Sequence, residues 1–330
     1  MLSLPRSPFE ILSDEHIAYQ SCLNLETVGD SWGTTVTDET AIMFKFSPEI
    51  VARVLGFGLI YPPSTQGRAY LARDISACND NSEFLAGLSY LCVMGVIRIF
   101  KSATPQLSSA DSLLSESNKK LALTRDNYRC ILTGAVDVAS VDNGLTTAGE
   151  RIRCTALGHI FSESPTGNIV GLTDAAQEKF EWATSITAVV QRFADISVVN
   201  VHSALNTFTI TPDFRVLFDK LRISLRPIGH DDSNTYEVHT YPPKRNGLYG
   251  LLDRVTLTDA TSGQIPLPSC RYFKAHDACA KIAYFSGAGK VMEEILQDAR
   301  DLKVLAEDGG SHLLSLAISL RLRGMTLAYS

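Results

Sequence analysis

The sequence has no paired-cysteine pattern and no excess of basic residues. Its seven cysteines are scattered along 330 residues and never fall in a CxxC motif. This distribution argues against a disulfide framework and against a structural zinc site, and it indicates a reducing compartment. The formal net charge is −6. A protein that grips duplex phosphate usually carries a basic excess, so nucleic acid is not the expected partner.

The sequence also shows no long apolar run, and we expect no targeting segment. The N-terminus has no basic stretch followed by an apolar run, so we expect no signal peptide and predict a cytoplasmic protein. The most apolar window, residues 84–100, is too short to span a bilayer and contains Arg98. Asn81 and Ser82 can cap a helix start just before it, so we expect a buried helix and no membrane span. With 45% hydrophobic residues, the chain can bury a real core.

Three regions differ in composition and pattern. The N-terminal region, 1–120, is mixed and helical, and it ends in a Ser-rich stretch, 101–120, that we interpret as a linker or exposed loop. The central region, 121–241, combines short strands and helices, and we expect the C-terminal region, 242–330, to pack on it. The predicted fold class is α+β, with helices from both ends of the chain wrapped around the central region.

Alternation and capping signals predict individual elements of this fold. Residues 206–210, NTFTI, are expected to form a strand, and Thr211 can cap a following helix that has Pro212 at its first position. Residues 221–227 and 235–241 alternate as the two strands of a hairpin. Residues 313–324 are compatible with either a strand or a helix. Further elements are expected as follows: a strand over 151–161, a helix over 171–193, and a C-terminal helix that is broken or ends near Gly287.

Five segments of the central region have specific sequences and follow one another in a specific order: RDNYRCILTG, GHIFSES, VHSALN, TPDFRVLFD and LRISLRP. Two further stretches, YPPSTQGRAYLARDISACND and HDACAKIAYFSGAG, lie before and after them. Together these residues resemble the fungal HNH-nuclease-domain proteins over most of the chain. The resemblance implies a ββα-metal core. In such a core a strand histidine activates water, an asparagine orients that histidine, and a helix histidine helps hold a divalent cation against the scissile phosphate.

Carried over onto this chain, the family pattern matches His159 in GHIF and Asn206 in ALNTF, but the helix-histidine position is Arg215. A guanidinium is always protonated and has no lone pair for a metal, and its charge repels a cation. Gly158 supplies no ligand at a position where many HNH sites have an acid. We therefore expect no metal. His202 is nearby in sequence and could compensate for the missing ligand.

This departure leads to the hypothesis of an enzyme that works without a cofactor. An arginine in the cation's place can still donate hydrogen bonds to a carbonyl, carboxylate or phosphate. We predict a cyclase or isomerase, with a Diels–Alder-type pericyclase as one form, acting on an apolar small molecule in fungal secondary-metabolite biosynthesis, for example of terpenoids. The predicted catalytic residues are His159, Arg215 and Asn206. The residues predicted to contact the substrate are His202, Trp182, Phe208, Phe214 and Phe218.

Other interpretations of the same residues stay open. Arg215 and Asp219 are spaced for an ordinary helix ion pair. Asn206 belongs to a residue type that more often stabilises a turn than contacts a ligand, and the phenylalanines named above can equally form plain core. At the level of function, the alternatives are a metal-dependent HNH endonuclease that uses His159 with His202, and a non-catalytic pseudonuclease that binds a partner.

Overall fold

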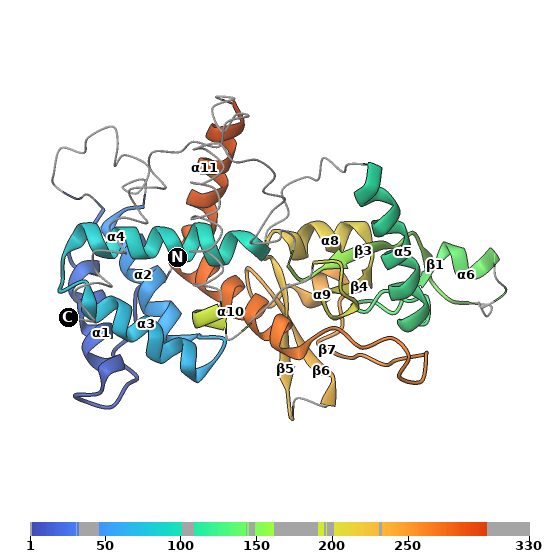
Figure 1. Ribbon diagram of the computed structural model, residues 1–330, viewed down its shortest axis with the longest axis horizontal. Coiled ribbons are helices and arrows are strands. Elements are labelled where there is room, and N and C mark those ends of the chain that lie inside the picture. Colours follow the sequence, from blue (N-terminus) through green and yellow to red (C-terminus); the bar gives the residue numbers. More distant parts are fainter. Residues whose placement is uncertain are drawn as a thin grey trace. The chain divides into compact units, whose positions relative to one another are not determined.

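The computed structural model describes residues 2–30, 32, 46–100, 109–142, 144, 149–161, 191–194, 196, 201–230 and 233–301 (Figure 1). Helices and strands are mixed, which confirms the α+β class. The chain divides into two compact units that interleave in sequence. Unit 1 comprises Met1–Arg98, Pro165–Ser197 and Lys281–Ser330, and unit 2 comprises Ile99–Ser164 and Val198–Ala280. These boundaries differ from those of the three regions that composition suggested.

Unit 1 is built from helices whose N-termini are marked by small polar caps. They are α1 (Asp14–Glu26), α2 (Pro48–Ile60), α3 (Thr65–Ala77) and α4 (Ser82–Leu91). Each cap side chain accepts a backbone N–H from the first turn of the helix that follows. The caps are Ser13, Ser47, Ser64 and Asn81. The cap predicted at Asn81 is therefore confirmed.

The apolar window 84–100 forms a buried helical segment whose second half is irregular. After α4 the chain continues as the π-helical turn η2 (Cys92–Ile97) and the 3₁₀ turn η3 (Arg98–Phe100). Val93 and Ile97 are 0% and 2% exposed, so the window is core, as predicted. Within the described part of the chain, no helix is both long enough and apolar enough to cross a membrane.

Two consecutive helices, α10 (Cys270–Ser286) and α11 (Ala288–Asp301), complete the described chain. Gly287 separates them with φ of +82°, a left-handed conformation that glycine adopts without steric cost. The predicted helix end near Gly287 is therefore confirmed. Residues 191–194, at the end of the helix predicted over 171–193, are helical. The rest of that prediction, with Trp182, and the tail 313–324 lie outside the described residues.

Unit 2 contains a helix where the sequence suggested a linker. Helix α5 (Ser109–Arg125) covers most of the Ser-rich stretch, so the loop prediction is wrong for residues 109–120. Residues 101–108 lie outside the described part. Composition alone gave the wrong prediction because the helix is stabilised by packing at its C-terminal end. Ala122 and Leu123, which lie at that end, are 1% and 8% exposed. The chain then forms β1 (Val136–Asp137), α6 (Val138–Asp142) and β2 (Ile152–Arg153), with β1 and β2 parallel.

A strand–strand–helix arrangement follows in unit 2 (Figure 1). Strand β3 (Ala156–His159) pairs antiparallel with β4 (Thr207–Ile210), which is preceded by the turn η4 (Ala204–Asn206) and followed by α8 (Pro212–Asp219). Strand β4 and helix α8 thus match their predicted places. Thr211 precedes α8 as expected, but the predicted capping hydrogen bond is absent. Its hydroxyl is instead buried, without a hydrogen-bond partner among the described residues.

The predicted hairpin is also present in unit 2. Strands β5 (Ile223–Ile228) and β6 (Thr235–Thr240) pair antiparallel, and β7 (Arg254–Thr256) extends the sheet in the order β5-β6-β7. The short helix α9 (Asn246–Tyr249) lies between β6 and β7 in sequence. Alternate residues of β6 are buried, which is the period-two pattern that the sequence shows, whereas in β5 the first three residues, Ile223, Ser224 and Leu225, are all buried.

A buried arginine ties α5 to the start of β4. Arg125 is 0% exposed, and its Nε and Nη2 atoms donate to the two carboxylate oxygens of Asp126 at 2.7 and 3.1 Å. Asp126 in turn accepts the backbone N–H of Thr209 at 2.7 Å. The remaining donors of Arg125 reach three backbone carbonyls, those of Ala204, Thr207 and Pro266. A buried charge is tolerated here because a paired carboxylate and hydrogen bonds replace its hydration.

Candidate functional site

His159 closes β3, directly opposite Thr207 of β4. Its half-buried imidazole has a pKa lowered from 6.5 to about 4, first by burial and then by the charges of Arg215 and His202. These two side chains therefore lie close enough to act on His159, although neither neighbours it in sequence. The imidazole is neutral at pH 7, so one of its nitrogens can donate a hydrogen bond and the other can accept one.

The residue before this histidine is a glycine because the sheet leaves no room for a side chain. A Cβ atom placed on Gly158 would lie 2.6 Å from the Phe208 ring and 3.0 Å from Ile210. Phe208 is opposite Gly158 in the register, and its ring fills the space above the glycine. An acid at position 158 is therefore excluded by packing with Phe208.

Asn206 acts on the backbone that surrounds the two strands. Its side-chain oxygen accepts the N–H of Phe161 at 2.8 Å, and its amide nitrogen donates to the carbonyls of Phe161 and Val201, both at 2.9 Å. The residue is 0% exposed. These bonds fix the chain just after β3 against the chain just before β4. The geometry thus gives Asn206 a positioning role beside His159.

Arg215 forms the helix ion pair that its spacing allowed. Its Nε lies 3.5 Å from Oδ2 of Asp219, and the two side chains are 31% and 16% exposed. Burial raises the pKa of the Asp219 carboxyl to about 6, although the Arg215 guanidinium opposes this effect. Arg215 therefore serves two neighbours, since its charge also lowers the pKa of His159. Arg215 can therefore pair with Asp219 and influence His159 at the same time.

The aromatic residues near α8 belong to the core. Phe208 and Phe218 are 0% and 1% exposed, and their rings meet edge to face with centroids 5.1 Å apart. Phe214 is 9% exposed. A substrate could reach Phe208 or Phe218 only if this core opened. The structure therefore favours core packing, one of the two interpretations that the sequence left open. Trp182 lies outside the described residues.

A histidine that was not predicted as a site residue packs against the last turn of α8. His276 of α10 is 0% exposed and stacks on Phe218 with ring centroids 3.9 Å apart. Its Nε2 lies 3.3 Å from the Phe218 carbonyl, and burial lowers its pKa to about 4. The neutral ring can thus donate to the last turn of α8. A lone histidine on a helix carries no sequence signal for this role.

The residues of this site do not fit a divalent cation. Among the described residues, no group of three or more His, Cys, Asp or Glu side chains could hold a metal ion. Asp219, the carboxylate beside the site, is paired with Arg215, and His202 is exposed. The fixed charge of Arg215 disfavours a second cation next to His159. We therefore derive no chemical step from a bound metal.

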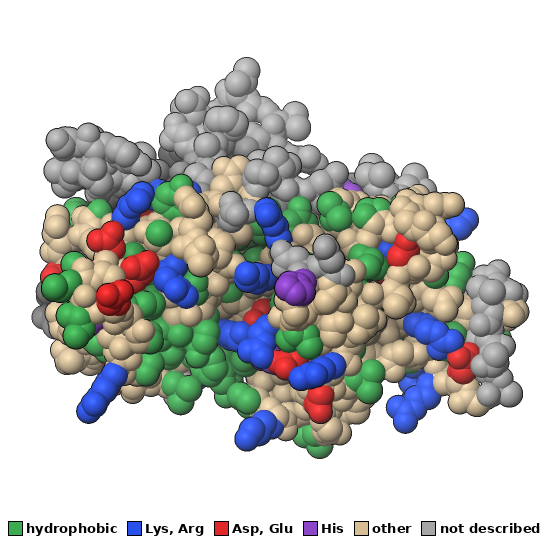
Figure 2. Space-filling view, turned by 90° about the horizontal axis from the view of Figure 1, so that it is seen from below, with side chains coloured by type: hydrophobic (Ala, Val, Ile, Leu, Met, Phe, Trp, Pro, Cys, Tyr) green, Lys and Arg blue, Asp and Glu red, His purple; other side chains and the backbone are tan. Residues whose placement is uncertain are grey.

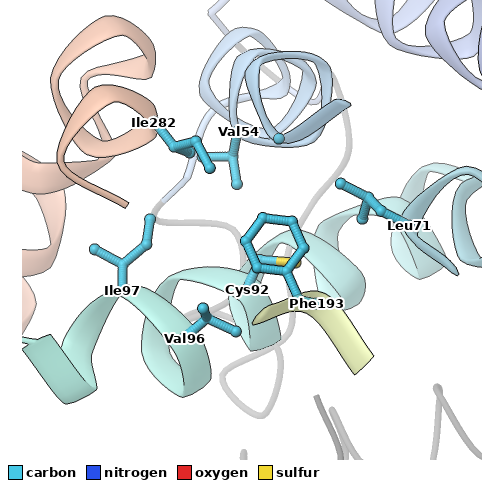
Figure 3. A pocket seen from close by; sticks show the side chains of 8 residues that line it. Val54, Leu71, Cys92, Val96, Ile97, Phe193 and Ile282 are labelled. Carbon is cyan, nitrogen blue, oxygen red and sulfur yellow. The ribbon is translucent and has the colours of Figure 1, made fainter. Parts of the chain in front are cut away.

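A small apolar hollow lies in unit 1, whereas His159 and Arg215 belong to unit 2. Figure 3 shows Val54, Leu71, Cys92 and Phe193 among the side chains that line it. Its water-accessible interior is about 10 Å³, which is room for about one water molecule. The hollow is therefore too small to hold an organic substrate in this conformation.

The chain has no match among known proteins in three comparisons: no family model, no curated protein and no solved structure matches it. The resemblance to HNH-nuclease-domain proteins therefore stays a prediction from the sequence motifs. The geometry of His159, Asn206 and Arg215 has to carry any functional conclusion.

Proposed function

We propose that unit 2 carries a cofactor-free cyclase or isomerase site, derived from an HNH-type strand–strand–helix core that has lost its metal. The substrate is an apolar small molecule with at least one carbonyl, as in secondary-metabolite pathways such as terpenoid biosynthesis. A Diels–Alder-type ring closure is one form of this chemistry. His159 and Arg215 are the proposed catalytic residues, and Asn206 positions the backbone beside them.

One observation carries this proposal: a neutral imidazole and a permanent cation lie within electrostatic reach of each other. The pKa of His159 is lowered to about 4, and Arg215 is among the causes. A neutral histidine is free to accept a proton from the carbon next to a carbonyl, and with a pKa of about 4 His159 does so as a weaker base than an ordinary histidine. A guanidinium can stabilise the negative charge that then develops on the carbonyl oxygen. Return of the proton at another carbon would complete an isomerisation without any cofactor.

The same pair also suits a cyclisation. A hydrogen bond from Arg215 to a carbonyl withdraws electron density from a conjugated double bond, which makes that bond more reactive toward a diene in the same molecule. Holding both partners in one reactive conformation would supply most of the remaining acceleration. In this form of the reaction His159 would act as a second hydrogen-bond donor, and no net proton transfer would be needed.

A metal-dependent endonuclease is the second candidate, because the sequence motifs around His159 and Asn206 resemble the HNH pattern and β3, β4 and α8 follow one another in the order that this resemblance implies. Arg215 and the packing around Gly158 weigh against it, since neither position offers a ligand. The net charge is −6, and acidic and basic side chains are interspersed on the face drawn in Figure 2. Phosphate binding usually needs a basic field instead.

The test uses the fact that an isomerase or an intramolecular cyclase leaves the mass of its substrate unchanged. Small-molecule extracts of the producing organism are incubated with the full chain in EDTA and compared by liquid chromatography and mass spectrometry. We expect one compound to be replaced by an isobaric compound with a different retention time. Arg215→Gln and His159→Ala should lose this conversion, while the surface controls Lys220→Gln and His230→Ala should keep it.

Three results would contradict the proposal. Full conversion by both Arg215→Gln and His159→Ala would remove these residues from the reaction. Plasmid nicking that requires Mg²⁺ or Mn²⁺ and is abolished by His159→Ala, without any isobaric conversion, would establish the endonuclease in its place. Absence of both activities would favour a non-catalytic binding protein.

A further inference from the structure

We propose that Arg215 binds a single carboxylate or enolate oxyanion of the substrate, and that the Asp219 carboxylate occupies this position in the ligand-free protein. This inference rests on the proposed function and specifies its substrate class: an apolar molecule that carries one ionisable oxygen. It also assigns Asp219 a role as an internal competitor that the substrate must displace.

The contact between Arg215 and Asp219 is too long for a strong hydrogen bond. Their closest atoms, Nε and Oδ2, are 3.5 Å apart, whereas charge-assisted N–H···O bonds usually measure about 2.7–2.9 Å. Arg125 provides a contrast within the same unit, because it meets Asp126 at 2.7 Å and uses its other donors on backbone carbonyls. Arg125 is locked in place, while Arg215 can exchange its partner.

Solvent can reach Arg215, so a dissolved ligand can do so too. Its side chain is 31% exposed and that of Asp219 is 16% exposed. The five N–H donors of a guanidinium exceed what one carboxylate at 3.5 Å can use. A second oxyanion could therefore approach before Asp219 leaves, which avoids an intermediate with an unpaired buried charge.

The balance of charges indicates a monoanion. Arg215 supplies one positive charge, and His159 beside it is neutral at pH 7. A carboxylate or enolate would replace the charge of Asp219 one for one, whereas a phosphate dianion would leave an uncompensated negative charge. The other charged residues of α8 and its end, Asp213 and Lys220, are exposed. They are screened by solvent and oppose each other in sign.

Displacement of Asp219 should be coupled to uptake of a proton. Once separated from Arg215, the half-buried carboxyl is stabilised in its neutral form. With a pKa of about 6, Asp219 is already protonated in roughly one molecule in 30 at pH 7.5. Anion binding should therefore be on the order of 30-fold weaker at pH 7.5 than at pH 5, because His159 stays neutral over this range.

The experiment is isothermal titration calorimetry of the full chain with benzoate, with benzyl alcohol as the uncharged analogue. We expect benzoate but not benzyl alcohol to bind, more tightly at pH 5 than at pH 7.5, with uptake of about one proton at pH 7.5. Asp219→Asn should bind benzoate at pH 7.5 with an affinity about 30-fold above that of the wild type and without proton uptake. Asp213→Asn changes the net charge equally and should behave like the wild type.

Loss of binding in Arg215→Gln but not in Lys220→Gln would support the assignment. Equal affinity of wild type and Asp219→Asn at pH 7.5, or equal gains in Asp219→Asn and Asp213→Asn, would overturn it. The outcome is independent of turnover. Benzoate binding as described, without any isobaric conversion, would support the anion site and refute the proposed reaction. Isobaric conversion without benzoate binding would support the proposed reaction and refute the anion site.

Discussion

The titration of His159 is the most direct test of the site. Its pKa is lowered to about 4, with burial as the largest cause and Arg215 as the next. Replacing Arg215 by Gln removes a positive charge, so the pKa of His159 should rise. It should stay below 6.5, because burial still disfavours the charged ring. Lys220→Gln removes the same charge from an exposed position at the end of α8 and should leave the pKa unchanged.

The lowered pKa also links the stability of the protein to pH. In the unfolded chain His159 binds a proton near pH 6.5, whereas in the folded chain it does so only near pH 4. The stabilisation is therefore complete above pH 6.5 and is lost as the pH falls through 4. The difference between the two pKa values corresponds to at most about 3 kcal/mol. His276 should contribute in the same direction and in the same pH window.

Both quantities can be measured on the same sample. Two-dimensional NMR of the histidine rings gives the pKa values, and His159→Gln and His276→Gln assign the signals. Thermal unfolding at pH 7 and pH 4.5 gives the linked stability, and His159→Gln should reduce the difference between the two pH values. The reasoning is refuted if His159 titrates near 6.5 in the wild type, or if its pKa is the same in Arg215→Gln.

Two further predictions concern the frame of the site, and both are measured by urea unfolding. Gly158→Ala should lower the free energy of unfolding by about 1–3 kcal/mol, because its Cβ would lie 2.6 Å from the Phe208 ring; no recovery in the double variant with Phe208→Leu would show that the ring is not the cause. Arg125→Lys should cost about 3–5 kcal/mol, because lysine cannot supply all the hydrogen bonds of the buried guanidinium. Arg129→Lys, at a pair whose arginine is 34% exposed, should cost no more than about 1 kcal/mol.

Elements with a strong local signal could be predicted from the sequence. The β5–β6 hairpin follows from alternation, and the start of α4 follows from Asn81 before an apolar run. The stretch 109–120 could not be predicted in this way, because its helix is stabilised by packing at its C-terminal end and not by its own composition. The missing capping hydrogen bond of Thr211 could not be predicted either, since a threonine before Pro212 is a typical cap but its hydroxyl is buried here without a hydrogen-bond partner among the described residues.

That His159, Asn206 and Arg215 form a functional site stays a prediction from the sequence. The structure adds that the charge of Arg215 is among the causes that lower the pKa of His159. The sequence could not identify Arg125, because a fully buried arginine is rare and its carbonyl partners lie up to 141 residues away. Nor could it give the raised pKa of Asp219, which depends on burial. Quantities set by tertiary packing have no local signature.

The interleaving of the two units has a consequence for how the protein is made. The polypeptide passes from one unit to the other after Arg98, Ser164, Ser197 and Ala280. No single proteolytic cut can therefore separate intact units. During synthesis the ribosome delivers the first segment of unit 1 long before Lys281–Ser330, so this unit cannot finish folding until unit 2 has been completely translated. Nascent unit 1 should thus be the part that depends most on chaperones.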